Sequence, residues 1–144
     1  MIDFKIQAGS WSELAQDAMQ IRRDVFILEQ HIPEDEEWDT LDASALHFVV
    51  YAEVHHQVQA IATARLLVKN SIGRVSVLKA YRGQGIGRIL MLKIIEQAKF
   101  EQRVSLKLSS QVHAIPFYES LGFAAQGNEY LDCGIPHIDM TLSI

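Results

Sequence analysis

The sequence predicts an α+β fold of mixed α/β character, with helices on both faces of a mixed β-sheet, and three observations support this. The chain has 144 residues, the length of one ordinary domain, so residues 1–144 are expected to form a single unit. Hydrophobic residues make up 49% and charged residues 22%, as in globular domains. Segments with strand periodicity and segments with helical periodicity are interspersed along the chain, without a repeat or a linker between them.

The N-terminal part is expected to form a strand and then a helix. A strand is predicted over residues 2–7. Ser10 and Glu13 fit a capping box, in which each side chain satisfies the other residue's backbone at the start of a helix. This helix is predicted to extend to about residue 28, because apolar residues recur at helical spacing. These residues are Leu14, Ala18, Ile21 and Val25.

Residues 34–42 are strongly acidic, with six carboxylates and no basic residue. The favoured interpretation is a solvated loop or short helix. The alternative is that Glu36 and Asp39 attract a cationic amine.

The remaining elements are predicted from periodicity and from turn residues. They are strands over 47–54, 58–67 and 74–78, a helix over 85–100, a strand over 104–108, a short helix over 114–121, and two strands over 123–131 and 137–142. Residues 55–57 are expected to form a hairpin turn, and Gly122 to end the short helix. Val104, Leu106 and Leu108 are expected to alternate into the core.

Composition excludes several classes of protein. Cys133 is the sole cysteine, which excludes an internal disulfide framework and a Cys-x-x-Cys zinc site, and the histidines show no metal-ligand spacing, so no metal is expected. A net charge of −5 argues against a nucleic-acid partner. No apolar run is long enough for a spanning helix, so no membrane partner is expected. The charged N-terminus does not resemble a signal peptide, so a cytoplasmic location is expected.

A glycine-rich turn between a strand and the long helix is the most specific local signal. It reads Arg82-Gly83-Gln84-Gly85-Ile86-Gly87-Arg88 and lies in a window, 73–100, that has six basic residues and one acidic residue. Glycines allow close approach to the backbone, and the free N–H groups of a helix start bind anions. The turn therefore predicts a phosphate or pyrophosphate site.

Two other glycine-rich phosphate sites do not fit this turn. A P-loop would continue Gly-Lys-Ser/Thr, whereas Gly87 is followed by Arg88 and Ile89. A dinucleotide fingerprint would have a third glycine where Arg88 stands. A glycine turn that serves only packing is the remaining alternative.

Arg82-x-x-Gly85-x-Gly87 after a Val-x-Val-Leu strand resembles the acyl-CoA signature of the GCN5-related N-acetyltransferases (GNAT). A second block, Phe117-Tyr118-Glu119-Ser120-Leu121-Gly122-Phe123, is similar to a strand–helix element of the same family. The segments 25–33 and 131–137 resemble its YjcF-like branch. One departure is Ser109-Ser110-Gln111, where relatives often have Asn-Ala-Gln.

The resemblance implies a GNAT fold, a mostly antiparallel twisted sheet in which two splayed parallel strands, 74–78 and 104–108, bind acetyl-CoA as co-substrate. It implies that the backbone of 77–79 pairs with the pantetheine arm, that an amide near Leu78 stabilises the oxyanion, and that 82–88 surround the pyrophosphate. The implied cofactor-binding residues are Val77, Leu78, Lys79, Arg82, Gly83, Gln84, Gly85, Ile86, Gly87, Arg88, Gln111 and Phe117. A homodimer is a family-level expectation.

The expected activity is direct transfer of an acetyl group to a primary amine of a small molecule or peptide. Tyr118 matches the family's position for the acid that protonates the leaving thiolate, and a packing role is its alternative. Glu29 and His137 are both candidates for the base, and a structural role competes for each of them. Cys133 is interpreted as structural or incidental. Two other functions compete with transfer, namely a catalytically silent CoA-binding module and a phosphate-binding domain for another nucleotide.

Overall fold

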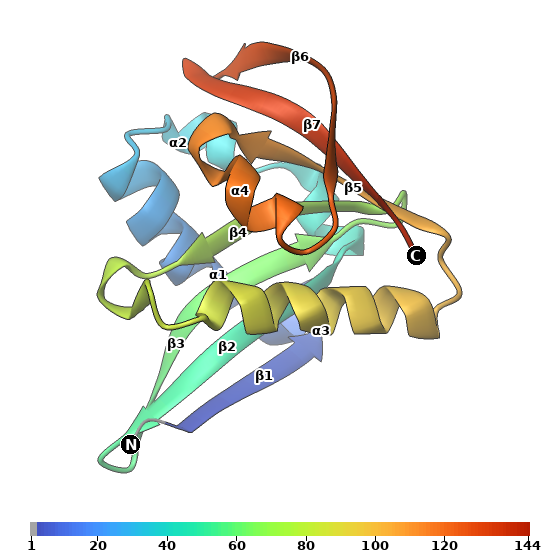
Figure 1. Ribbon diagram of the computed structural model, residues 1–144. Coiled ribbons are helices and arrows are strands. Elements are labelled where there is room, and N and C mark those ends of the chain that lie inside the picture. The colour runs from blue at the N-terminus through green and yellow to red at the C-terminus, as the bar shows by residue number, and fades with distance from the viewer. Residues whose placement is uncertain (1–2) are drawn as a thin grey trace.

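A computed structural model describes residues 3–144 and is built around a seven-stranded sheet in the order β1-β2-β3-β4-β5-β7-β6 (Figure 1). The strands are β1 Asp3–Gly9, β2 Leu46–Val54, β3 Gln57–Leu66, β4 Ser71–Val77, β5 Ser105–Gln111, β6 Ala124–Asp132 and β7 Ile135–Ser143. Within these residues β4 and β5 are parallel, and the other neighbouring strands are antiparallel. The predicted mixed, mostly antiparallel sheet is confirmed. Ile2, the first residue of the strand predicted over residues 2–7, lies outside the described residues.

Helices cover both faces of this sheet, as expected. In Figure 1, α3 crosses the near face and α1 lies behind the sheet. The helical segments are α1 Trp11–Arg22, η1 Arg23–Glu29, α2 Glu34–Glu37, η2 Thr40–Ser44, η3 Lys79–Tyr81, α3 Ile86–Phe100, η4 Val112–Ala114 and α4 Ile115–Glu119. The predicted stripe Leu14, Ala18, Ile21 and Val25, which extends from α1 into η1, is at most 4% exposed. On α3 the apolar residues Ile86, Leu90, Ile94 and Ala98 recur at helical spacing and are at most 1% exposed. Burial of these two stripes fixes both helices on the sheet.

The parallel pair separates soon after it forms. β4 and β5 are in register only at Ser71 with Lys107 and at Ile72 with Leu108. Their carboxyl ends, Val77 and Gln111, therefore lie on two diverging arms, and α3 and α4 follow these arms. The predicted splayed pair is confirmed.

A β-bulge lies on one arm. The residues on either side pair with β3, but Arg74 and Val75 both stand opposite Ala64, and Arg74 has a φ of 54°. A bulge leaves backbone groups out of the ladder and bends the strand. The bulge therefore turns the end of β4 away from β5.

Two local predictions are wrong. The helix predicted to about residue 28 is α-helical only to Arg22 and continues as the π-helix η1, in which the Gln30 amide donates to the Val25 carbonyl at 3.0 Å. Hydrophobic spacing does not distinguish a π-turn from an α-turn, since both keep one face buried. Val104 precedes β5 and is 73% exposed, because the strand begins one residue later.

The expectation that the acidic segment is solvated is wrong for Glu37 and Asp42, which are 2% and 3% exposed. Arg22 of α1 binds both, with its Nε 2.8 Å from Glu37 Oε2 and its Nη1 2.8 Å from Asp42 Oδ1. Arg65 of β3 lies 2.9 Å from Asp42 and 2.7 Å from Asp39. The bonds from Arg65, with smaller effects from charge, lower the pKa of Asp39 to about 2.

Arg74 completes this buried network. Its guanidinium reaches Glu37 Oε2 at 3.1 Å and Asp39 Oδ2 at 3.3 Å. Three guanidiniums from α1, β3 and β4 thus balance three carboxylates of the acidic segment. The network joins residues 37–42 to the bulge of β4.

We predict that Arg22→Met destabilises the protein by about 3–5 kcal/mol, because it removes the fully buried cation of the network, and Glu37 and Asp42 then keep only Arg74 and Arg65, respectively. Arg23→Met is the matched control, since Arg23 forms an exposed pair with Glu34 and its loss should have a far smaller effect. Urea unfolding of the two variants measures the difference. Equal destabilisation by both would contradict the role given to the network.

Candidate active site

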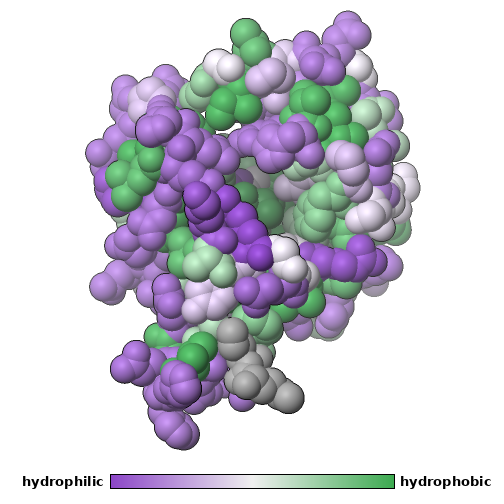
Figure 2. Space-filling model, turned by 60° about the vertical axis from the view of Figure 1, so that its left-hand side comes forward, coloured by the Kyte–Doolittle hydropathy of each residue, from purple (hydrophilic) through white to green (hydrophobic). Residues whose placement is uncertain are grey.

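The diverging ends of β4 and β5 enclose a cavity of about 780 Å³. It is lined by η1 and α2 on one side, by β4 and the start of α3, by the end of β5 with α4, and by the β6–β7 turn. Figure 2 shows this face hollowed, with hydrophobic groups at depth and hydrophilic groups around the rim. This cavity therefore lies where the two arms part.

One end of the cavity is built to accept an anion. α3 begins after Gly85, which has a φ of 79°, a left-handed conformation that favours glycine. A Cβ at Gly83 or Gly85 would meet no atom within 4 Å, so the turn leaves open space above the first N–H groups of the helix. Arg88 lies beside it and lines the cavity. This arrangement is a helix-terminal anion site with an added cation.

Most residues expected to bind the cofactor line this cavity, but three do not. The lining ones are Val77, Arg82, Gly83, Gly85, Ile86, Gly87, Arg88, Gln111 and Phe117. Leu78, Lys79 and Gln84 are absent from the lining. The Leu78 amide itself donates to the Ile61 carbonyl of β3 at 2.9 Å, so the oxyanion donor expected near Leu78 would have to be a neighbouring amide.

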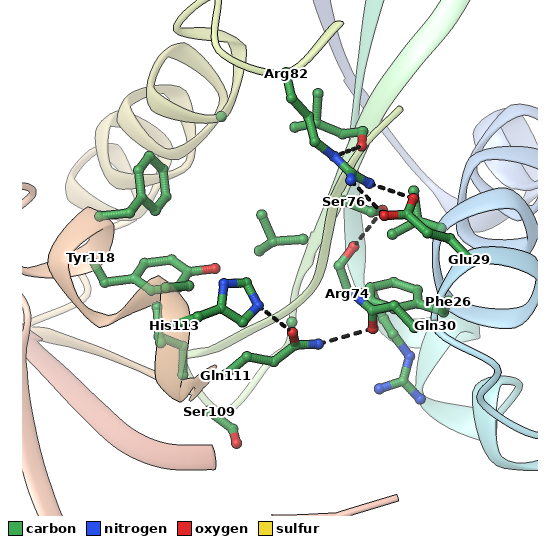
Figure 3. A pocket seen from close by; sticks show the side chains of 18 of the residues that line it. Phe26, Glu29, Gln30, Arg74, Ser76, Arg82, Ser109, Gln111, His113 and Tyr118 are labelled. Carbon is green, nitrogen blue, oxygen red and sulfur yellow. Dashed lines mark hydrogen bonds and ion pairs between the residues drawn. The ribbon is translucent and has the colours of Figure 1, made fainter. Parts of the chain in front are cut away.

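Glu29 and Arg82 form a bridge on the side of η1 (Figure 3). The two guanidinium N–H groups donate to the carboxylate at 2.6 and 2.7 Å, and Arg82 Nε donates to the Val77 carbonyl at 2.9 Å. The bond from Arg82 is the largest cause of the lowered pKa of Glu29. A lowered pKa makes Glu29 a weaker base, so the geometry favours a positioning role.

A second bridge joins the end of η1 to the other arm. Gln111 Nε2 donates to Gln30 Oε1 at 2.9 Å, and His113 Nε2 lies 2.8 Å from Gln111 Oε1 (Figure 3). Sequence reasoning did not assign Gln30 or His113 to the site, although Gln30 lies in the segment 25–33 that resembles the YjcF-like branch. The end of the π-helix is thus tied to both arms of the cavity.

Tyr118 extends from α4 into the cavity, with its hydroxyl toward the centre in Figure 3. The residue is 8% exposed, and the hydroxyl has no hydrogen-bond partner among residues 3–144. Burial raises the pKa of Tyr118 to about 12. The phenol therefore stays protonated at neutral pH and is free to donate.

His137 lines the opposite part of the cavity, near the β6–β7 turn, and is 8% exposed. Its Nδ1 lies 2.7 Å from the Ile135 carbonyl, so Nδ1 carries a proton and Nε2 is left as an acceptor in the neutral ring. The ring stacks on Tyr130, whose hydroxyl donates to Asp139 at 2.6 Å. These contacts fix the ring's orientation.

Several charged residues of the acidic segment and of the basic window form ion pairs instead of facing a ligand. Two bases of the window 73–100 are engaged by carboxylates, because Arg74 belongs to the buried network and Lys93 lies 3.7 Å from Glu96. Arg82 and Arg88 are the basic residues that line the cavity at its anion end. Asp39 is held by arginines and is not available to an amine, whereas Glu36 lines the cavity.

Two further features concern metals and membranes. Across residues 3–144, no group of three or more His, Cys, Asp or Glu side chains is arranged to hold a metal ion. None of the helices described is long and apolar enough to cross a membrane.

Comparison with known proteins agrees with this geometry. A family model described as an acetyltransferase (GNAT) domain matches residues 13–144. The chain belongs to the GNAT family. The Bacillus subtilis N-acetyltransferase YjcF is 36% identical over 133 residues, which cover 89% of this chain and 91% of YjcF. B. subtilis YyaT is 37% identical over 134 residues, covering 89% and 88%. These relatives place this GNAT domain in the YjcF-like branch.

Solved structures show the same fold. An acyl-CoA N-acyltransferase from Pseudomonas aeruginosa has a TM-score of 0.82 and 30% identity, with 97% of this chain and 99% of that chain covered. Escherichia coli ElaA has a TM-score of 0.79 and 30% identity, with 99% of each chain covered. This GNAT protein is an acyl-CoA-dependent N-acetyltransferase.

We predict that Glu29→Gln speeds amide hydrogen exchange at residues 28–31 of this GNAT protein, because the neutral amide cannot form the paired charge-assisted bonds to Arg82. Glu34→Gln, which breaks the exposed pair with Arg23, is the matched control and should leave this segment unchanged. Exchange followed by mass spectrometry measures the effect. Unchanged exchange in Glu29→Gln would show that the bridge does not hold η1.

Proposed function

We propose that this enzyme transfers an acetyl group from acetyl-CoA directly to a primary amine of a small molecule or peptide. The observation that carries the proposal is Tyr118, a largely buried side chain whose hydroxyl points into the cavity between the splayed strands and has no hydrogen-bond partner among residues 3–144. Direct transfer needs a neutral amine, a stabilised oxyanion and a proton for the leaving thiolate. Separate groups of the chain can meet each need.

The cofactor end fits the diphosphate of CoA. Side chains at positions 83 and 85 would occupy space that is open above the start of α3, and the glycines keep it open. Gly87 faces Phe117, since its Cβ would lie 3.4 Å from the ring. We therefore assign the N–H groups of this turn and Arg88 to the phosphates, and the Val77 and Phe117 side of the cavity to the pantetheine arm.

Arg82 has two roles available to it. In this structure it binds Glu29 and the Val77 carbonyl, which is a backbone acceptor on the arm assigned to pantetheine. Cofactor binding at this arm would compete with Arg82 for that carbonyl. Arg82 would then be free to turn toward the phosphates.

The oxyanion donor is assigned to the bulge of β4. Arg74 and Val75 stand opposite one residue of β3, so a backbone N–H there is released from the ladder, and both residues line the cavity. An amide held by the bulge is preorganised for a developing charge.

The base is assigned to His137. His137 lines the cavity, and its Nδ1 bond to the Ile135 carbonyl leaves Nε2 to take up a proton, whereas Glu29 is engaged by Arg82 at both oxygens. In the reaction the amine nitrogen attacks the thioester carbonyl and gives its proton to His137 Nε2. The carbon–sulfur bond then breaks, and Tyr118 protonates the thiolate.

We predict that replacing Gly85 and Gly87 with valine abolishes stabilisation by CoA while the fold survives. Valine at position 85 conflicts with a φ of 79°, and valine at 87 meets Phe117. Thermal melting with and without CoA measures the loss, because stabilisation follows ligand concentration over Kd. Gly127→Val is the control, since Gly127 also has a positive φ, 76°, but lies on β6 outside the cavity lining. Undiminished CoA affinity in the folded double variant would overturn the site.

We predict that Tyr118→Phe lowers acetyl transfer by about 10²–10⁴-fold and leaves CoA affinity within a few-fold, because only the proton donor is removed. Release of CoA thiol with a panel of primary amines measures turnover, and melting curves check the fold. Transfer at the parent rate would show that Tyr118 only packs. CoA binding without any amine-dependent thiol release in the parent protein would instead identify a silent CoA-binding module.

A further inference from the structure

We propose that Arg82 forms an autoinhibitory contact in this structure, and that CoA binding moves its guanidinium from Glu29 and the Val77 carbonyl to the cofactor and thereby loosens the end of η1. The pair of Arg82 and Glu29 would thus act as a latch that CoA opens. This inference rests on the proposed binding of CoA along Val77 and adds a conformational step to it.

Arg82 occupies a backbone acceptor in the opening between β4 and β5. Its Nε donates to the Val77 carbonyl at 2.9 Å, at the end of the arm assigned to pantetheine. Arg82 and Val77 both line the cavity, so the guanidinium lies where a ligand would approach this carbonyl (Figure 3). Pantetheine on this arm and Arg82 in its present position therefore compete for the same acceptor and the same space.

The ion pair that holds Arg82 is one that a ligand can displace. Its bonds to Glu29 are short, 2.6 and 2.7 Å, but the two side chains are 39% and 35% exposed. Such pairs contribute little to stability, because water solvates the separated charges. A phosphate group accepts paired N–H bonds from a guanidinium as a carboxylate does. Arg82 directly precedes the turn whose N–H groups are assigned to the diphosphate, so the new partner would bind beside it.

The end of η1 depends on the same ion pair. The buried residues of η1 both lie in its first half, and Leu28 in the second half is 62% exposed. Two side-chain bridges hold this second half, one from Glu29 to Arg82 and one from Gln30 to Gln111 at 2.9 Å. A segment with few buried contacts opens locally at low cost. Transfer of Arg82 to CoA would leave the end of η1 with one bridge in place of two.

The two equilibria are coupled in both directions. If CoA weakens the bond between Arg82 and Glu29, then a change that weakens this bond must strengthen CoA binding by the same factor. An ion pair that only braces the site would have the opposite effect, because its loss would disorder the site and weaken CoA binding. The sign of the change in CoA affinity therefore separates a latch from a brace.

Amide hydrogen exchange of the parent protein, with and without saturating CoA, is the first test. Exchange at residues 28–31 should become about two- to fivefold faster with CoA, whereas exchange at residues 83–87 should become slower because the diphosphate covers these N–H groups. In Glu29→Gln, exchange at 28–31 should already be fast and should not rise further with CoA.

Calorimetric titration with CoA is the second test. Glu29→Gln should bind CoA about two- to fivefold more tightly than the parent protein. Glu36→Gln is the matched control, because it also removes a negative charge from the cavity lining but Glu36 is not bonded to Arg82. Its CoA affinity should equal that of the parent protein. Melting curves of both variants check the fold.

Unchanged or slower exchange at residues 28–31 in the CoA complex of the parent protein would overturn the inference and leave the proposed function intact. Weaker CoA binding by Glu29→Gln would do the same, and so would equal tightening by Glu36→Gln, which would indicate charge repulsion alone. A parent protein that does not bind CoA would instead overturn the proposed function, and the latch with it.

Discussion

The separation of β4 from β5 is the constraint on which the site depends. The two strands pair at two positions and then diverge, so the sheet contains an opening instead of a continuous ladder. Backbone groups at such an opening lack their usual partners, and a ligand or a side chain must satisfy them. In this structure Arg82 satisfies one of them, the Val77 carbonyl. The start of α3 and the bulge of β4 both line this opening.

The buried ion-pair network supports the β4 side of the opening. The network of three arginines and three carboxylates connects α1, the acidic segment and the bulge, and Arg74 belongs both to the network and to the cavity lining. A buried network is costly to break because each loss leaves an unpaired charge. The position of α2, and with it Glu36, is therefore coupled to the geometry of β4. The α2 side of the cavity and the end of β4 are therefore held by the same set of contacts.

Local patterns in the sequence predicted most of the fold. The apolar stripes of α1 and α3, the Ser10 capping box and the succession of strands and helices along the chain depend on neighbouring residues, and the structure confirms them. The role of Glu37 and Asp42 could not be predicted from neighbouring residues, because their partners Arg22, Arg65 and Arg74 lie 15 to 37 positions away on other elements. The same holds for the Leu78 amide, whose partner is on β3. Motif spacing identified the anion end and Tyr118, but Gln30 and His113 enter the site through tertiary contacts.

The account's central claim is that acyl transfer takes place between the diverging strands, beside Tyr118. A crystal structure of the complex with CoA tests this most directly. The account predicts the diphosphate on the N–H groups of residues 83–87 and the CoA sulfur within hydrogen-bond distance of the Tyr118 hydroxyl. CoA bound with its sulfur outside the β4–β5 opening, or with the Tyr118 hydroxyl turned away from it, would contradict the account.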